Sequence, residues 1–268
     1  MTIVKDSTDD TTKHEYTALV TGFGFFGEIP ITAGLIAKLL PSSLASKDPL
    51  NPSGKNIAIL GPKADYAAIP AEFGTIRRRT KELHTELGSK VDLWIHLGQW
   101  AQDWVTCERR AFRQDFLSTW NLHNGDKHYY SSPDSLGKNI DDAGPNPWLD
   151  VPLGLHSEVP VDATVSGANE QLARHGEKKG DQPLRVASHF EAGAHGCGLI
   201  FYESMANCYV QGRKRDVLFV HVPPGTDQDR LEKGKEAVLA IIGSAIAALV
   251  NRKLMTKEDF VRTLALTP

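Results

Sequence analysis

Val217-Leu-Phe-Val-His221 is a strongly apolar run that ends in a histidine. Runs of this kind are typical of strands buried on both faces of a parallel sheet. It lies between two stretches with helical character, Cys197 to Gln211 and Asp227 to Val250. The order of strand and helix continues outward from this run and predicts an α/β fold with a mainly parallel sheet, covered by helices on both faces.

The same alternation extends toward the N-terminus. Further strands are expected at Tyr16–Thr21, Asn56–Leu60, Val91–Leu97 and Leu184–Ser188, with an extended segment at Trp104–Phe116. Further helices are expected at Thr32–Leu40, Pro70–Leu87 and Ala163–His175, with a last short one from Thr256. Thr32 and Thr256 are the predicted N-caps of their helices, because a threonine side chain can accept a hydrogen bond from a free N–H of the first turn.

Composition sets the domain organisation and excludes several classes of function. Residues 1–15 predict a flexible tail, and residues 16–268 a single α/β domain with an irregular excursion at about 121–160. The net charge of −3 gives no reason to expect nucleic acid or a membrane as a partner. Ala237 to Val250 is too short to span a bilayer and predicts a buried helix. Three cysteines and no signal-like start favour the cytoplasm.

Three residues suggest a cysteine hydrolase. Cys197 follows a glycine-rich turn at the predicted start of a helix, whose dipole and free N–H groups favour a thiolate. His221 ends an apolar strand and can supply the base that such a thiol needs. Glu108 follows the strand that ends at Gly98 and can return over the same sheet edge to orient the imidazole. The other cysteines, Cys107 and Cys208, are expected to be structural.

Cofactor and metal chemistry are not expected. Gly22-Phe-Gly-Phe-Phe-Gly27 matches a dinucleotide-binding pattern, but Glu28-Ile-Pro30 follows it where a helix N-terminus should receive phosphate. His189 and His195 lie near Cys197 without a second ligand pair at zinc spacing. His195 is expected to face solvent. The sequence therefore predicts no cofactor and no metal.

At these residues the chain resembles the pyroglutamyl peptidase I (pyrrolidone-carboxylate peptidase) family of cysteine peptidases. Four segments carry the resemblance in the same order: Val20-Thr-Gly-Phe-Gly-Phe-Phe-Gly27, His96-Leu-Gly-Gln99 with Thr106-Cys-Glu-Arg109, Ala192-Gly-Ala-His-Gly-Cys197, and Phe219-Val-His-Val-Pro223. The resemblance implies Cys197 as nucleophile, His221 as base and Glu108 as its orienting partner. It also implies a three-layer α/β/α sandwich with a mixed, mostly parallel sheet.

The resemblance further implies a substrate and its pocket. Phe23 and Phe26 would line a slot for the 5-oxoproline ring, with Gln99 nearby. The implied reaction is hydrolysis of the amide after an N-terminal pyroglutamyl residue of small peptides.

Several positions depart from the family pattern. Phe25 replaces a proline, Thr32-Ala-Gly34 replaces Asn-Pro-Ser, and Gly196 and Gly198 replace a bulky residue and an asparagine. Only Arg113 offers a match for the arginine that polarises the scissile carbonyl in relatives. Two alternatives therefore stay open. One is a cysteine hydrolase of the same fold with altered acyl specificity, and the other is a catalytically idle relative that acts as a binding or regulatory protein.

Overall fold

The computed structural model describes residues 14–61, 64, 67–113 and 130–254. Within this part of the chain, nine strands form one sheet and a short hairpin forms a second. The predicted tail (1–15), apart from its last two residues, and the predicted helix from Thr256 lie outside the described residues.

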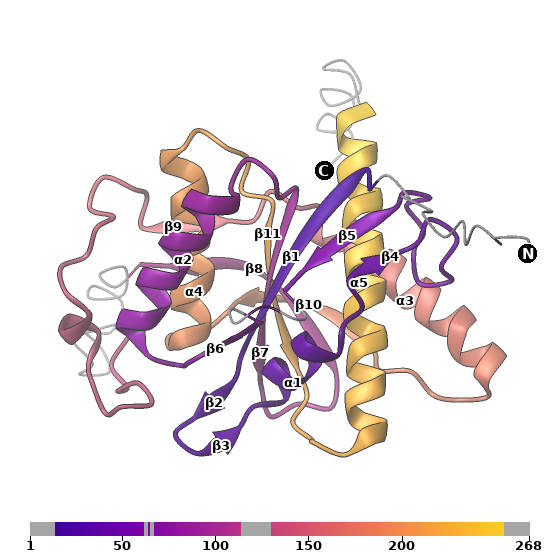
Figure 1. Ribbon diagram of the computed structural model, residues 1–268, viewed down its shortest axis with the longest axis horizontal. Helices are drawn as coiled ribbons and strands as arrows, with labels where there is room; N and C mark the ends of the chain where they lie inside the picture. The colour runs from indigo at the N-terminus through magenta and orange to yellow at the C-terminus, as the bar shows by residue number, and fades with distance from the viewer. Residues whose placement is uncertain (1–13, 62–63, 65–66, 114–129, 255–268) are drawn as a thin grey trace, which may run out of the picture.

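The large sheet is mixed and mostly parallel (Figure 1). Its strands are β1 (Tyr16–Phe23), β4 (Ser43–Leu44), β5 (Ile57–Leu60), β6 (Ala68–Ile69), β7 (Leu93–Gln99), β8 (Val105–Phe112), β9 (Gly154–His156), β10 (Val186–Glu191) and β11 (Val217–Val222). The order is β10-β8-β11-β7-β1-β5-β4, with β6 beside β1 and β9 beside β8. The four strands β11, β7, β1 and β5 run parallel to one another. The hairpin consists of β2 (Phe25–Phe26) and β3 (Ile29–Pro30).

Helices cover both faces of this sheet, so the three-layer α/β/α prediction is confirmed (Figure 1). One face carries α1 (Thr32–Leu39), α3 (Val161–Lys179) and α5 (Gln228–Leu254), and the other carries α2 (Phe73–Leu87) and α4 (Gly196–Val210). Strand side chains point alternately to the two faces. On β7, Leu93, Ile95 and Leu97 belong to one apolar core and Trp94 belongs to the other.

Helix α5 is part of the first core. By length and composition alone it could cross a membrane, but 78% of its apolar window is buried inside the protein. Ala237, Ile241 and Ala245 have no exposed surface. The prediction that Ala237–Val250 is a buried helix is therefore confirmed.

The predicted extended segment Trp104–Phe116 contributes β8, which lies inside the sheet next to β11. The two strands run antiparallel, with Phe219 opposite Glu108 and His221 opposite Thr106. Strand β10 pairs with β8 in parallel on the other side. Glu108 therefore belongs to the extended segment that was predicted, but it lies inside the sheet with no exposed surface and not over the sheet edge.

The prediction that Thr32 is an N-cap is wrong. Ile31 occupies the cap position, and Thr32 is the first helical residue of α1. The Thr32 hydroxyl and Gly225 exchange two hydrogen bonds of 3.0 Å, one to the Gly225 carbonyl and one from its N–H. A contact 193 residues away in the sequence has taken this hydroxyl, so it does not cap its own helix.

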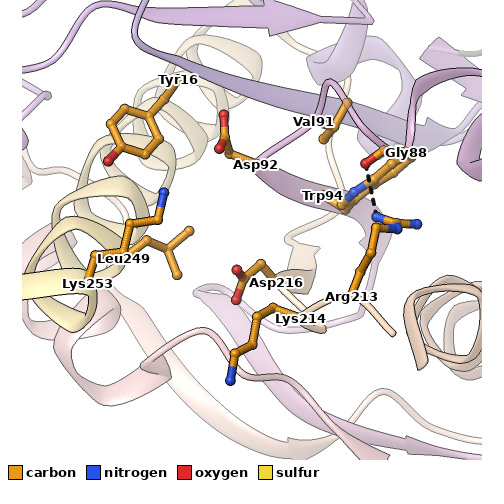
Figure 2. Close-up of a pocket in the computed structure, with 10 residues that line it drawn as sticks. All are labelled: Tyr16, Gly88, Val91, Asp92, Trp94, Arg213, Lys214, Asp216, Leu249 and Lys253. Carbon is orange, nitrogen blue, oxygen red and sulfur yellow. Dashed lines mark hydrogen bonds between the residues drawn. The ribbon is translucent and has the colours of Figure 1, made fainter. Parts of the chain in front are cut away.

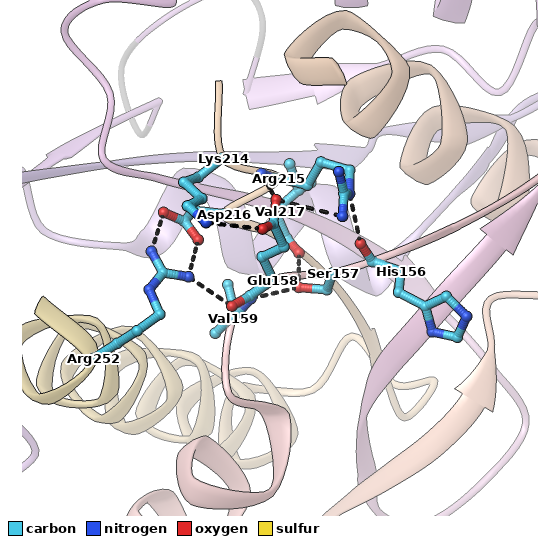
Figure 3. A network of polar contacts seen from close by, with 9 residues as sticks. All are labelled: His156, Ser157, Glu158, Val159, Lys214, Arg215, Asp216, Val217 and Arg252. Atoms are coloured by element: carbon cyan, nitrogen blue, oxygen red, sulfur yellow. Dashed lines mark hydrogen bonds and ion pairs between the residues drawn. The ribbon is translucent and has the colours of Figure 1, made fainter. Parts of the chain in front are cut away.

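The excursion predicted at about 121–160 is irregular in part. Residues 121–129 lie outside the described residues, whereas Ile140–Ala143 forms a 3₁₀ helix (η4) and Gly154–His156 forms β9. The end of the excursion is fixed by polar contacts (Figure 3). The Ser157 hydroxyl donates to the Val217 carbonyl at 2.6 Å, and Arg252 donates to both the Glu158 carbonyl and the Asp216 carboxylate. This network fastens the segment to the start of β11 and to α5.

Candidate active site

The three residues predicted to act together lie on one face of the sheet, the one covered by α2 and α4. Glu108 and Phe219 are register partners, as are His221 and Gly98. Register partners point to the same face of a sheet, and so do residues two apart on one strand. Glu108, Phe219, His221 and Gly98 are therefore neighbours on the same face of the sheet.

Glu108 and His221 form a buried hydrogen-bonded pair. Oε1 of Glu108 lies 2.8 Å from Nδ1 of His221, and the two side chains have 0% and 6% of their surface exposed. The Thr106 hydroxyl donates to the same Oε1 at 2.7 Å. Because the carboxylate only accepts, Nδ1 of His221 carries the proton, and Nε2 is left with the lone pair that a base requires.

Cys197 is the second residue of α4, which begins one residue before the predicted start. The preceding strand, β10, runs in the opposite direction to β11 and β7, so its end does not lie beside His221. Residues 192–195 carry the chain from the end of β10 to Cys197. The thiol lies over Gly98, the register partner of His221: a Cβ added at Gly98 would be 3.0 Å from Sγ. Both side chains belong to the described part of the chain, and no hydrogen bond joins them there. Any proton transfer between the thiol and His221 would thus require the two side chains to approach each other.

The thiol is neutral in this setting, contrary to the expected thiolate. Desolvation raises the pKa of Cys197 to about 12, and the negative charge of Glu108 adds to the rise. The backbone N–H of Cys197 acts in the opposite direction without overcoming burial. Helix N-termini favour thiolates, but here burial dominates, so a proton acceptor must act with the thiol.

A pocket of about 210 Å³ opens beside Cys197. Its lining includes Phe23, Phe26, Gln99 and Cys197, so the structure brings the predicted pocket residues together with the predicted nucleophile. Phe23 is 4% exposed and forms the floor, whereas Phe26 of the β2–β3 hairpin is 45% exposed. The pocket therefore joins a buried and an exposed phenylalanine to the thiol in one lining.

Two polar groups in the pocket differ from expectation. The Gln99 carbonyl accepts a hydrogen bond of 2.9 Å from the Thr32 N–H at the start of α1, so its carbonyl end is engaged by the protein. His195, expected to face solvent, lines the pocket and lies between the rings of Phe26 and Phe73, at 6.0 and 5.4 Å between centroids. Its Nε2 lies 2.9 Å from the Pro133 carbonyl and therefore carries a proton.

The glycines beside Cys197 have different roles. A Cβ at Gly198 would be only 1.9 Å from the Gly193 carbonyl oxygen, so the turn before α4 leaves no room for a side chain. At Gly196 the nearest atoms, on Phe23 and Ile76, would be 3.4 Å away, which is ordinary contact. The turn at 192–195 thus accounts for glycine at 198, and nothing in the structure requires it at 196.

Arg113 is engaged by the excursion. The Arg113 guanidinium donates to the carbonyls of Trp148 and Leu149 and fastens the excursion. The described part of the excursion contacts the surroundings of the pocket at Pro133, whose carbonyl lies beside His195, and at Ser135, whose N–H donates to the Ala71 carbonyl.

The other cysteines are structural, as predicted. Cys107 and Cys208 have no exposed surface and belong to the two apolar cores. Cys107 alternates with Glu108 on β8 and so points to the opposite face of the sheet.

Sequence reasoning did not identify Gly98 and Thr106 as parts of the site. The sequence contains a signal for each: Gly98 ends an apolar strand, and Thr106 precedes Glu108 by two residues on an extended segment. His189 and Trp100 were also missed, because their neighbours lie on other strands.

A second hollow lies at the opposite end of the sheet, at the start of β7 (Figure 2). Trp94, Asp92, Arg213 and Lys253 are among its lining residues, and none of the described residues that line it is a cysteine or histidine. Among the described residues, this hollow therefore has no cysteine to act as a nucleophile and no histidine to act as its base. The described residues also contain no group of three or more His, Cys, Asp and Glu side chains that could hold a metal ion.

Comparisons with known proteins agree with this fold. No protein-family model matches the sequence, and no curated protein does. Among solved structures, the pyrrolidone carboxyl peptidase from Thermococcus litoralis is similar, with a TM-score of 0.62 at 19% identity over 88% of this chain and 96% of that one. The enzyme from Pyrococcus furiosus is similar with a TM-score of 0.59 at 21% identity, over 89% of this chain and all of that one. The protein described here therefore has the fold of these pyrrolidone carboxyl peptidases.

Proposed function

We propose that this protein is a cysteine exopeptidase that hydrolyses the amide after an N-terminal pyroglutamyl residue of small peptides. The observation that carries the proposal is the buried Glu108–His221 pair beside Cys197, at the edge of a pocket built from Phe23 and Phe26. The fold it shares with peptidases supports a hydrolase of this kind.

The chemistry follows from the positions of three groups. Nε2 of His221 takes the Cys197 proton as the thiol attacks the carbonyl carbon of the pyroglutamyl residue. The imidazolium that forms is stabilised by Glu108, and the N–H groups at the start of α4 stabilise the oxyanion. His221 then returns the proton to the leaving amine. Water, activated by the same histidine, attacks the thioester, releases 5-oxoproline and restores the thiol.

Recognition of the ring rests on shape and on a hydrogen bond from Gln99. A neutral lactam suits a slot lined by Phe23 and Phe26, because burial of its apolar atoms needs no charge partner. The Gln99 carbonyl is engaged by Thr32, so the amide N–H₂ end of Gln99 is the group that would donate to the lactam carbonyl. The three cysteines are unpaired thiols, which supports a reducing compartment such as the cytoplasm.

The decisive experiment is release of a fluorescent amine from a pyroglutamyl-amide. Wild type should release it, and Cys197→Ala and His221→Ala should lose the activity. If wild type is no faster than these two variants, the proposal fails.

A second candidate is a cysteine hydrolase of the same fold with another acyl preference. His195 favours it, because this histidine adds a polar ring to the slot. A panel of N-acyl amides with different acyl groups separates the two candidates. A catalytically idle relative is distinguished by iodoacetamide, which should alkylate Cys197 rapidly near neutral pH only if His221 acts as its base.

A further inference from the structure

Glu108 contacts a second histidine that the mechanism above does not use. Nδ1 of His189 lies 2.7 Å from Oε2 of Glu108, while His221 contacts the other oxygen. His189 belongs to β10 and is the register partner of Glu108. The carboxylate therefore lies between two imidazoles on the strands that flank β8.

The surroundings of His189 show which ring nitrogen carries a proton. Nδ1 also lies 2.9 Å from the Glu191 carbonyl, and both of its neighbours are oxygens that only accept. Nδ1 of His189 therefore carries a proton and donates it. The Trp100 ring meets the edges of both imidazoles, at 5.0 Å from His189 and 5.2 Å from His221 between centroids.

The two histidines differ in their access to water. The side chain of His189 has 36% of its surface exposed, against 6% for His221. His189 can therefore exchange a proton with solvent while it stays bonded to a carboxylate that has no exposed surface.

We propose that His189 is a positioning residue for the Glu108–His221 pair. By holding Oε2, it fixes the rotation of the carboxylate so that Oε1 faces Nδ1 of His221. When His189 takes up a second proton, it draws the charge of Glu108 toward itself, and His221 becomes a weaker base. The inference rests on the proposed Cys197, His221 and Glu108 chemistry, but not on the acyl group that the pocket accepts.

Other charged groups around His189 are few in the described part of the chain. They include Glu108 and Arg110 on β8, Arg109 on the same strand, which donates to Ser188, His221 on β11 and Glu191 on β10 itself. Because two histidines share one carboxylate, a proton taken up by His189 also changes the charge that His221 faces. The loss of activity in acid should therefore depend on His189.

Three variants test the proposal. His189→Asn keeps a neutral donor near the position of Nδ1 but cannot titrate, and His189→Ala removes the donor. His156→Ala is the matched control, since His156 is an exposed histidine on β9 that pairs with the same strand at Arg110. The readouts are kcat and KM for a pyroglutamyl-amide, the pH profile of kcat, and the rate of Cys197 alkylation by iodoacetamide.

The expected result is a kcat about tenfold lower in His189→Ala, with KM within about twofold of wild type, because an unfixed carboxylate weakens base catalysis without touching the pocket. His189→Asn should recover most of the rate, and the acid limb of its pH profile should be shallower than that of wild type. His156→Ala should match wild type. The rates of Cys197 alkylation should follow the same order among the variants. Cys107 and Cys208 have no exposed surface and should not react with iodoacetamide in the folded protein.

Several outcomes would overturn the proposal. One is a His189→Ala variant that keeps the wild-type kcat and alkylation rate. Another is a His189→Asn variant that is as slow as His189→Ala. The third is a His189→Asn variant whose acid limb is the same as that of wild type. If His189→Ala does not fold, the acid limb of His189→Asn decides. If wild type does not cleave pyroglutamyl-amides, the function proposed above fails, and the alkylation rates and their pH dependence still decide the role of His189.

Discussion

Replacing Gly98 by alanine should slow the chemistry without unfolding the protein. The added Cβ would be 2.6 Å from Cζ of Phe219 and 3.0 Å from Sγ of Cys197, both closer than ordinary contact. The Phe219 ring has no exposed surface and touches the His221 ring, with centroids 4.8 Å apart. The substitution therefore pushes on the nucleophile directly and on the base through Phe219.

The magnitude follows from these distances. Thiol and ring must each move by at least a few tenths of an ångström, and misplacement approaching 1 Å costs about 10²-fold in rate. We expect kcat/KM to fall by about 10- to 100-fold. Overpacking of this kind costs about 1–3 kcal/mol of stability, which leaves a folded protein.

The assay is release of a fluorescent amine from a pyroglutamyl-amide, with iodoacetamide alkylation of Cys197 and thermal unfolding measured in parallel. Gly74→Ala is the matched control, because a Cβ at that position of α2 meets nothing within 4 Å. It should keep full activity and gain a little stability, as alanine is favoured over glycine in helices by about 0.5–1 kcal/mol. A Gly98→Ala variant with kcat/KM and alkylation rate within twofold of wild type would refute the reasoning.

Three other substitutions test separate parts of the structure. Glu108→Gln should lower kcat by about 10²- to 10⁴-fold, and because the Glu108 charge contributes to the raised pKa of Cys197, a pH titration of alkylation should shift to lower pH; an unshifted titration would contradict this. Gly198→Ala should cost at least about 1–3 kcal/mol, since its Cβ would lie 1.9 Å from the Gly193 carbonyl oxygen, and a wild-type melting temperature would argue against that crowding. Burial lowers the pKa of His84 to about 2, with the Arg213 charge adding to the effect, so the folded state keeps it neutral. The unfolded chain takes up a proton below about pH 6.5, so the stability present above that pH is lost as pH falls, by up to about 1.4 kcal/mol per unit. Urea unfolding between pH 7 and 4.5 should show a smaller loss of stability in His84→Gln than in wild type. Equal losses in the two proteins would contradict this role of His84.

Much of the site could be predicted because its signals are local. Cys197 at a helix start and His221 at a strand end follow from patterns within a few residues, and both positions are confirmed. Glu108, the predicted partner of His221, lies in hydrogen-bond contact with it, but from a strand inside the sheet and not from over the sheet edge. A local pattern identifies an extended segment, but the direction in which that segment enters a sheet depends on strands elsewhere in the chain.

The sequence by itself determined the order of strands and helices, the two-sided covering of the sheet, and the candidates for nucleophile, base and carboxylate. These follow from side-chain periodicity, which is a property of neighbouring residues. Only the tertiary structure decided that β8 runs back beside β11, that His189 shares Glu108 with His221, and that burial keeps the Cys197 thiol neutral. Each of these depends on groups that are 81 to 113 residues apart, or on the exclusion of water by many residues together. Hydrogen bonds and desolvation act through space, so no local pattern in the chain could carry them.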